Sequence, residues 1–482
     1  MSTQKKLMTN WRWWICSLLF VATTVNYLDR QVLSLTAKEF IYPDFHWTDA
    51  NYGIITSYFS LFYAFCTLFV GKFVDWIGTK KGYLIAIGLW STAACLHALC
   101  GVATQWIHGY ESLEAMRMVE DGTAAATAIA STGVWLFLCC RGLLGLGESG
   151  NFPAAIKVTA EYFPKKDRAF ATSIFNSGAS VGALVAPLVI PPLAKAMGWE
   201  WAFIIIGALG FIWMGFFVQW YEKPENSKHV NEAELEYIQQ DNSQEEIPVE
   251  TTPADEKSVS LLRCFTFKQT WSFCAGKFFS DGVWWFMLFW APAYFQDVYG
   301  YKASSGTGML LIMTLYFIVT FLSIALCKLP NYFVDKKGME IYSGRMRAMF
   351  LIALIPLVGL LAQPLGAYSA WWPAIIIGLV GAGHQAWSAN IFSTIGDMFP
   401  KSAVATIVGI GTMAGGISSF LINRLSGKFF VYAEGMGSQF TFMGFEGKPA
   451  AYFIVFCICA VCYLLGWTVM KTLVPKYKPV EI

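Results

Sequence analysis

Residues 71–81 read GKFVDWIGTKK and separate two long apolar runs, at about 50–71 and 82–104. Each run has the length of a helix that crosses a bilayer. A short charged stretch between two such runs predicts a tight loop where one spanning helix ends and the next begins. Apolar runs of similar length recur along the whole chain, so the sequence predicts a polytopic membrane protein.

The loop has the pattern G-x-x-x-D-x-x-G-x-K-K. A carboxylate in this position can cap a helix N-terminus and pair with a basic side chain. We expect the loop to act as a gating latch between helices and not as a substrate site. Its residues are Gly71, Asp75, Gly78, Lys80 and Lys81.

The composition excludes a soluble enzyme. Of the 482 residues, 56% are apolar and only 14% are charged, against about 25% in a typical soluble chain. The net charge of +2, without a basic stripe, argues against nucleic-acid binding. The His and Cys residues show no metal-like spacing, so we expect neither a metal nor a cofactor.

Twelve segments are apolar and long enough to span a bilayer. Only helices fit them, because lipid offers no partner for free backbone groups and strands would be shorter and alternating. The first segment is too long for a signal-peptide core and is expected to be a span. The predicted spans are 13–36, 50–71, 82–104, 132–158, 169–192, 200–221, 268–295, 304–327, 347–366, 370–396, 403–425 and 449–471.

The positions of Lys and Arg orient these spans. With the N-terminus inside, 24 of the 34 Lys and Arg residues fall on the inner side, six on outer loops and four within or at the ends of spans. This asymmetry follows the positive-inside rule. We therefore expect both termini in the cytoplasm.

The polar stretch 222–266 divides the chain into two halves of six spans, 1–221 and 267–482. Its charge predicts a solvated cytoplasmic linker that is partly helical or disordered. We expect parallel half-repeats with a binding site between them near the middle of the membrane.

Two landmarks recur in the halves, an Asp-containing loop and a Phe-Pro-Lys sequence. The first half has 89 residues from Asp75 to Pro164, and the second has 65 from Asp335 to Pro400. The difference of 24 residues predicts an insertion in the first half, and we assign it to the outer polar segment 105–131.

The same repeat relates two polar residues. Glu148 lies sixteen residues before Pro164, and His384 lies sixteen residues before Pro400. We expect the two side chains to face each other across a central cavity.

Ionisable side chains inside spans cost about 2.5–3.5 kcal/mol each on insertion scales, so each is a functional candidate. The alternative is that such charges neutralise one another and lock helices together. The set comprises Asp29, Arg30, Arg141, Glu148, Lys277, Asp281 and His384.

Spacing predicts how these groups pair. Asp29 and Arg30 are adjacent and point about 100° apart, so each needs a partner on another helix or a ligand. Lys277 and Asp281 are four apart and can pair within one helix. Several glycines near Glu148 allow close helix packing.

A polar cluster begins at His384. It reads HQAWSAN, and we expect it to line the cavity, with Trp387 able to stack on a sugar ring. A satisfied core histidine and a core-packed tryptophan are the alternatives. The cluster residues taken as substrate-binding are His384, Gln385, Trp387 and Asn390.

These motifs resemble those of the major facilitator superfamily. The 71–81 loop is similar to its signature loop. NYLDR at 26–30, RGLLGLGE at 141–148 and EYFPKKDRAFATSIFNSG at 161–178 resemble the anion:cation symporter family. GHQAWSAN at 383–390 is similar to bacterial hexuronate transporters.

The resemblance covers nearly the whole chain and implies an all-α major facilitator fold of twelve helices in two pseudo-repeated halves. It also implies proton-driven uptake of an organic anion by a cell inner membrane protein. By residue, it makes Asp29 and Glu148 the protonatable pair. Arg30 would bind the substrate carboxylate, and Arg141 would modulate Glu148.

The resemblance adds further cavity residues, namely Tyr27, Asn176 and a basic contact at Lys277. It favours a hexuronate, because galactonate-type relatives lack the His-Gln pair. Another organic anion such as galactonate is the alternative substrate, and a transporter-like membrane sensor is the alternative outside transport. The expected partners are the anion, protons and the lipid bilayer, and the expected state is a monomer.

Overall fold

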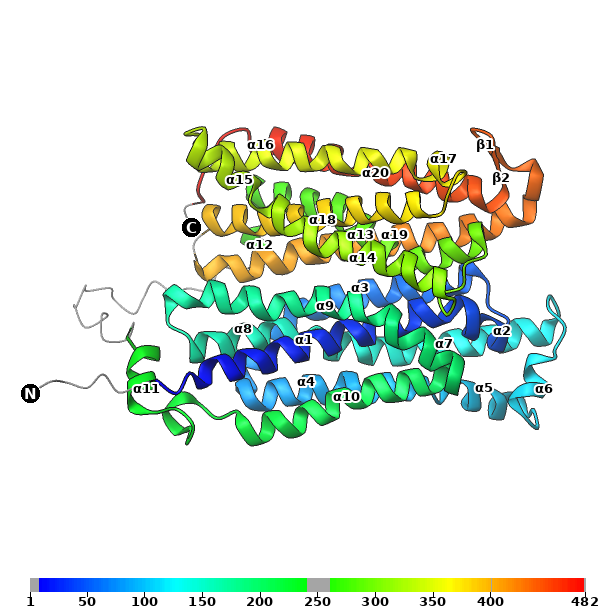
Figure 1. Cartoon of the computed structure of the whole chain (residues 1–482), viewed down its shortest axis with the longest axis horizontal. Helices are drawn as coiled ribbons and strands as arrows, with labels where there is room; N and C mark the ends of the chain where they lie inside the picture. Colours follow the sequence, from blue (N-terminus) through cyan, green and yellow to red (C-terminus); the bar gives the residue numbers. More distant parts are fainter. Residues whose placement is uncertain (1–7, 241–260, 400, 481–482) are drawn as a thin grey trace, which may run out of the picture.

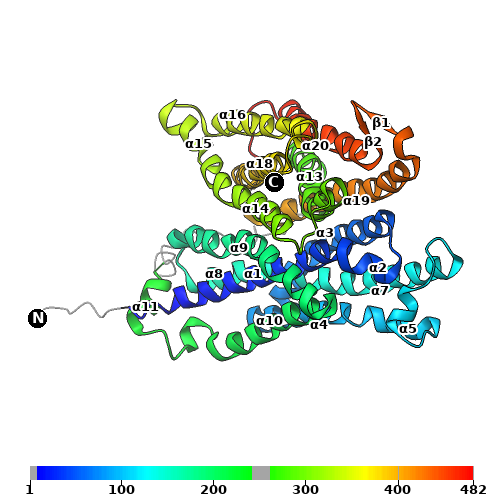
Figure 2. The same ribbon diagram turned by 45° about the vertical axis from the view of Figure 1, so that its right-hand side comes forward.

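The computed structural model describes residues 8–240, 261–399 and 401–480, almost entirely as helices. Figures 1 and 2 show two groups of long helices that lie against each other. The N-terminal group contains α1 (Trp11–Thr36), α3 (Asp49–Ile77), α4 (Thr79–His97), α5 (Cys100–His108), α7 (Ala124–Glu148), α8 (Asn151–Tyr162), α9 (Lys165–Met197) and α10 (Trp199–Trp220). The C-terminal group contains α13 (Lys268–Tyr299), α14 (Gly306–Cys327), α15 (Leu329–Asn331), α16 (Ile341–Leu354), α17 (Ala362–Gly366), α18 (Trp371–Met398), α19 (Lys401–Met436) and α20 (Gly447–Leu473).

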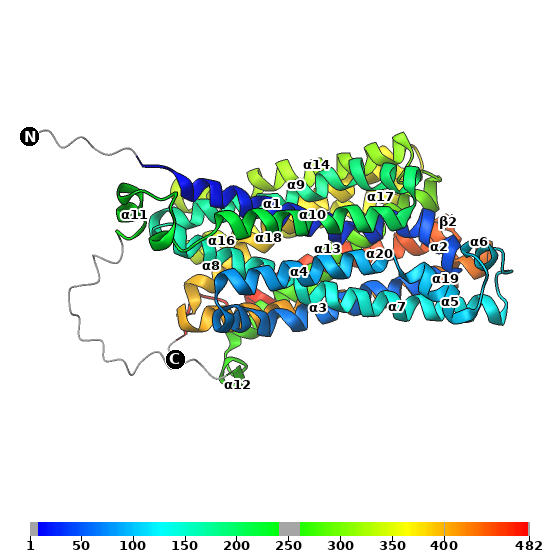
Figure 3. The same cartoon turned by 90° about the horizontal axis from the view of Figure 1, so that it is seen from below.

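The bundle has two distinct ends, seen from below in Figure 3. At one end α1 begins beside α11 (Glu232–Ile238), and we call it the terminal end; the short α12 (Leu261–Cys264) lies toward this end on the other side of the bundle. At the other, called the opposite end, lie the π-helical turn η1 (Ala37–Ile41), α2 (Tyr42–Phe45), α6 (Leu113–Arg117) and the two-stranded hairpin of β1 (Thr441–Phe442) and β2 (Phe445–Glu446).

Eight helical segments of the described chain are long and apolar enough to cross a membrane, or nine if the bent pair of α4 and α5 is one span. The helices α1, α13 and α18 are 26, 32 and 28 residues long but do not meet the same apolarity criterion. With these three, every predicted span coincides with a long helical segment. The three less apolar helices carry most of the candidate polar residues, which is why their composition departs from that of lipid-facing spans.

Two predicted boundaries are wrong. The fourth span was expected from residue 132, but α7 begins at Ala124, because the Thr123 hydroxyl caps the helix by accepting a hydrogen bond from the Ala126 amide at 3.2 Å. The polar segment 105–131 is therefore shared by α5, α6 and the first turns of α7. The eleventh span was expected to end at 425, but α19 continues to Met436, since Phe430 is fully buried against Tyr452.

Glycines on α7 admit α4 at close range. A Cβ on Gly147 would lie 2.5 Å from the backbone nitrogen of Trp90 and 2.7 Å from the backbone carbonyl oxygen of Ala86. Gly142, on the same helix, would meet nothing closer than a Phe62 ring carbon at 3.9 Å. The predicted close packing is confirmed at Gly147 and is not needed at Gly142.

The loop at 71–81 is a single-residue break between two helices. Gly78 joins α3 to α4 with a φ of 94°, a conformation that favours glycine. Lys80 donates a hydrogen bond to the Val218 carbonyl at 3.0 Å. The side chain of Asp75 lies outside the described residues, so its predicted latch role stays a prediction.

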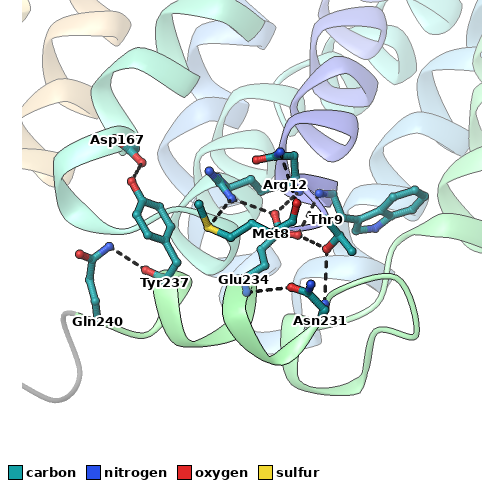
Figure 4. A network of polar contacts seen from close by, with 10 residues as sticks. Met8, Thr9, Arg12, Asp167, Asn231, Glu234, Tyr237 and Gln240 are labelled. Atoms are coloured by element: carbon teal, nitrogen blue, oxygen red, sulfur yellow. Dashed lines mark hydrogen bonds and ion pairs between the residues drawn. The ribbon is translucent and has the colours of Figure 1, made fainter. Parts of the chain in front are cut away.

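The linker helix α11 docks on the start of α1, as Figure 4 shows. The Glu234 carboxylate is buried and accepts hydrogen bonds from the Trp11 amide at 3.0 Å and the Arg12 amide at 3.1 Å. It also pairs with the Arg12 guanidinium at 3.0 Å. Tyr237 donates a hydrogen bond to Asp167 of α9 at 2.7 Å. A negative charge here satisfies the free N–H groups of α1 and its dipole.

The helix in this part of the linker agrees with the expectation of a partly helical segment, but the burial of Glu234 and Ile238 differs from the expected solvated segment. The reason is that Glu234 finds partners on α1 that the linear sequence does not reveal. Residues 241–260 of the predicted linker lie outside the described residues, so its bounds and those of the two predicted halves stay predictions.

The glycine packing gives a stability test. Gly147→Ala should destabilise the bundle by about 1–3 kcal/mol, because the added methyl group meets backbone atoms of α4 that cannot move independently. The apparent melting temperature in detergent measures this loss. Gly142→Ala is the matched control and should melt at or slightly above the wild-type temperature. Equal melting of the two variants would contradict the close approach at Gly147.

Candidate functional site

The centre of the N-terminal group holds a buried ion pair between α1 and α7. Arg30 Nη2 lies 2.7 Å and Arg30 Nε 3.0 Å from Glu148 Oε2. The two side chains are 4% and 0% exposed. Both nitrogens reach one oxygen, and Glu148 Oε1 has no hydrogen-bond partner among the described residues. The predicted need of Arg30 for a partner on another helix is confirmed.

Three aromatic rings surround the Arg30 guanidinium. Its Cζ lies 5.0 Å from the ring centroid of Tyr27, 4.8 Å from that of Tyr63 and 5.1 Å from that of Trp285. Such cation–π contacts strengthen when water is excluded. Trp285 belongs to α13, so the C-terminal group contributes directly to the environment of this ion pair.

Two further charges are buried beside this pair without a polar partner. Asp29 is 2% exposed, and neither carboxylate oxygen makes a hydrogen bond to a described residue. Arg141 is also 2% exposed, and its three guanidinium nitrogens have no described hydrogen-bond partner. Its Cζ lies 5.2 Å from the Phe59 ring centroid. An unpaired buried charge is costly, so both groups are suited to bind a proton or a counter-charge.

A second ion pair lies on α13. Lys277 Nζ is 2.7 Å from Asp281 Oδ2, with side chains 7% and 10% exposed. The predicted pairing four residues apart is confirmed. Lys277 also lies 4.8 Å from the ring centroid of Phe392 on α18. The cation is therefore neutralised within its own helix in this conformation.

His384 is held by two side chains of the C-terminal group. Its ring stacks on Trp284 with centroids 5.1 Å apart and planes 1° apart. Its Nδ1 lies 2.9 Å from the Tyr463 hydroxyl. These contacts fix the ring orientation, and the residue is 5% exposed.

The other residues of the 383–390 motif have different environments. Trp387 is fully buried, and its indole nitrogen donates to the Gly276 carbonyl at 3.4 Å. The Asn390 amide donates to the Ala386 carbonyl at 2.8 Å. Gln385 is half-buried. In this conformation Trp387 packs in the core, as in the alternative that the sequence left open.

Asn176 on α9 is exposed, whereas Tyr27 is half-buried beside Arg30. The structure therefore brings Tyr27, Asp29, Arg30, Arg141 and Glu148 into one region of the N-terminal group. Their roles in binding stay predictions.

Glu148 and His384 each bond within their own helix group. Neighbouring residues of α13 connect their surroundings: Trp285 lies over Arg30, which binds Glu148, and Trp284 stacks on His384. Neither residue lines either of the two cavities described. That the two side chains face each other across a cavity stays a prediction.

A four-charge network joins the two helix groups at the opposite end. Lys38 Nζ lies 2.9 Å from Asp49 Oδ1 and 3.0 Å from Asp297 Oδ1. Lys448 Nζ lies 2.8 Å from Asp49 Oδ2 and 3.7 Å from Asp297 Oδ2. Each carboxylate therefore contacts a lysine from each group, and all four are largely or completely buried. We call these four residues the opposite-end network.

Further hydrogen bonds lie at the same end. Tyr452 donates to Asp297 at 3.0 Å within the C-terminal group, and Tyr52 of α3 donates to the Phe289 carbonyl of α13 at 2.8 Å, which joins the two groups. Glu39 accepts a hydrogen bond from the Ser304 hydroxyl at 2.5 Å. No sequence motif contains the residues of the opposite-end network. Its members are 11 to hundreds of residues apart, and no linear pattern relates them.

Comparisons with known proteins agree with this architecture. The family model described as "Major Facilitator Superfamily" matches residues 19–422. The hexuronate transporter of Escherichia coli strain K12 is 26% identical over 98% of this chain and 96% of its own. The galacturonate transporter of Dickeya chrysanthemi is 26% identical over 60% of this chain and 74% of its own. The D-galactonate transporter of Escherichia coli O6:H1 is 23% identical over 87% of this chain and 89% of its own.

Solved structures show the same fold. A bacterial homolog of the human lysosomal transporter Spinster, inward-facing and unoccupied, aligns over the whole of both chains with a TM-score of 0.68 and 16% identity. A D-xylose-proton symporter aligns over 96% of this chain and 97% of its own, with a TM-score of 0.67 and 15% identity. The family match, the spanning helices and these folds together identify a multi-pass membrane transporter and not an enzyme. The chain belongs to the Major Facilitator Superfamily.

Proposed function

We propose that the chain takes up a hexuronate, such as glucuronate or galacturonate, together with protons in the bacterial inner membrane. The names of the hexuronate and galacturonate transporters among its relatives support this substrate class. The observation that carries the proposal is the buried Arg30–Glu148 pair with Asp29 and Arg141 beside it. This arrangement contains both a cation that can bind the substrate carboxylate and acids that can bind the transported protons.

Competition for Arg30 would link substrate to protons. A substrate carboxylate that binds Arg30 displaces Glu148, because one guanidinium cannot fully satisfy two carboxylates in a dry site. Glu148 then remains as a buried anion without its partner, and protonation removes that cost. Asp29, which makes no hydrogen bond to a described residue, provides a second acid nearby.

The C-terminal group would complete the site. Trp285 covers Arg30, and Lys277 could exchange Asp281 for a second oxygen of the substrate. His384 and Gln385 supply hydrogen-bonding groups for sugar hydroxyls, with Tyr27 and Asn176 on the N-terminal group. Alternating access would expose this set to one side of the membrane at a time.

The Lys and Arg bias places the terminal end in the cytoplasm. The opposite-end network then closes the outer side, and its lysines and carboxylates separate when the transporter opens outward. Burial makes the network costly to break one partner at a time, so closure is cooperative.

D-Galactonate is the second candidate substrate, because a D-galactonate transporter is 23% identical over 87% of this chain. Uptake of labelled glucuronate, galacturonate and galactonate into proteoliposomes with an imposed pH gradient distinguishes a hexuronate from D-galactonate as the substrate. Accumulation of either uronate above galactonate supports the proposal. Accumulation of none of them would contradict it and favour a sensor.

Glu148→Gln should abolish accumulation driven by the pH gradient while retaining exchange of internal for external substrate. The amide cannot take up a proton but can still occupy space beside Arg30. Uptake into proteoliposomes measures accumulation driven by the pH gradient, and counterflow measures exchange. We expect accumulation to fall at least tenfold. Glu111→Gln, an exposed glutamate at the opposite end, is the control and should accumulate normally. Full gradient-driven accumulation by the Glu148 variant would exclude it from coupling.

Asp297→Asn should shift the transporter toward a form open at the opposite end. Removing this carboxylate leaves the two lysines with Asp49 and with the exposed Glu434, which lies 2.9 Å from Lys448 Nζ, and breaking a buried pair costs about 3–5 kcal/mol. Spin labels on Cys introduced at Met118 and Tyr368, both exposed at this end, report the separation of the helix groups on a cysteine-free background. Asp121→Asn, which loses a pair with His46 inside the N-terminal group, is the control. Unchanged label distances in Asp297→Asn would refute the closing role.

A further inference from the structure

A cavity of about 1500 Å³ opens beside α3 and α7, and neither Arg30 nor Glu148 lines it. We call it the lateral groove. Apolar side chains line most of its length, and several of them are exposed, including Tyr58 at 47%, Phe62 at 42% and Trp135 at 67%. These residues lie on spanning helices, so the groove faces the lipid and not the aqueous phase.

The groove is long enough to hold an extended acyl chain. At 1.5 Å per residue its lining extends about 16 Å on α3, from Asn51 to Phe62, and about 30 Å on α7, from Ala126 to Leu146. One acyl layer is about half of the 30 Å hydrocarbon core of a bilayer, so both walls are long enough for one chain. Apart from Arg424, the charged residues of the lining and His46 lie at the opposite end of the groove. Its polarity therefore changes along its length as that of a lipid does.

One cation lies in this groove at membrane depth. Arg424 of α19 lines it, and its Nη1 is buried without a hydrogen-bond partner among the described residues. The preceding residue, Asn423, places its carbonyl oxygen 2.7 Å from the position of a Cβ on Gly53. Gly53 is four residues, about one turn, inside the first residue of α3. Arg424 thus lies about one turn below the end of α3.

No ion pair joins Arg424 to an acid among the described residues, and three acids at the opposite end have other partners. Asp121 pairs with His46 at 2.6 Å, and Asp44 pairs with Arg117 at 2.6 Å. Asp49 belongs to the opposite-end network. The described residues therefore offer Arg424 no anion, although an unpaired charge at this depth is unfavourable.

We propose that the lateral groove binds a phospholipid of the outer leaflet, with its phosphate on Arg424 and one acyl chain between α3 and α7. A guanidinium binds two phosphate oxygens with parallel hydrogen bonds, which are stronger than neutral ones. The apolar wall excludes a free anion, and the charge makes the site poor for a purely apolar ligand. Because α3 and α7 form the walls while α19 supplies the cation, the bound lipid connects the two helix groups.

Native mass spectrometry of the purified full chain tests this site, with phosphatidylglycerol as the titrated probe. Arg424→Gln should weaken binding of the tightest phosphatidylglycerol by at least about tenfold, equivalent to about 1.4 kcal/mol. Lys428→Gln removes an exposed positive charge one turn away on α19 and is the matched control. Equal binding by Arg424→Gln and wild type would overturn the proposal.

A second variant tests whether the acyl chain lies between α3 and α7. Its result does not depend on whether Arg424→Gln folds. Gly142→Phe places a ring in open space within the groove and leaves Arg424 intact. It should also weaken phosphatidylglycerol binding, whereas unchanged binding would show that the lipid lies elsewhere. Diacylglycerol with the same chains should bind weakly, and millimolar inorganic phosphate should not displace the lipid. Tight diacylglycerol binding, or displacement by phosphate alone, would each overturn the proposed mode.

Discussion

The ion pair between Arg30 and Glu148 is the interaction on which the candidate site depends. Lipid cannot solvate either charge, so the two helices that carry them, α1 and α7, must hold them together. The pair uses only one oxygen of Glu148, and Asp29 and Arg141 have no hydrogen-bond partner within the part of the chain that the structure describes. The region is therefore electrically balanced but incompletely bonded, a condition in which an added anion or proton redistributes the pairing.

The helix groups are joined differently at the two ends. At the opposite end, two lysines and two carboxylates cross the boundary and are mostly buried. At the terminal end, the described linker helix α11 contacts α1 and α9 of the N-terminal group. The charged network crosses the boundary between the groups at one end, and the linker helix contacts only one group at the other. This arrangement is suited to a transporter that alternates between a form closed at one end and a form closed at the other.

Small residues determine how closely helices pack within the N-terminal group and between the two groups. Gly147 allows α4 to contact the α7 backbone, which fixes the height and rotation of Glu148, its neighbour in sequence. Gly53 and Gly427 allow a similarly close approach between α3 and α19, next to the opposite-end network. On the lipid side of this crossing, α3, α7 and Arg424 leave the lateral groove open, so the bilayer becomes part of the protein's environment.

The sequence by itself predicted the order and approximate position of the long helical segments, because bilayer thickness sets a minimum length for each, although only eight or nine of them in the described chain meet the length and apolarity criterion for a span. It also determined which side chains are costly in lipid, and local spacing correctly predicted the Lys277–Asp281 pair. It did not determine the start of α7, the extension of α19 or the burial of Glu234, which depend on a cap and on contacts from distant residues. Only the tertiary structure decided that Arg30 pairs with Glu148, that Trp387 packs in the core, and that Lys38, Asp49, Asp297 and Lys448 meet. Charges in a low-dielectric interior choose partners by distance in space, and separation along the chain does not encode that distance.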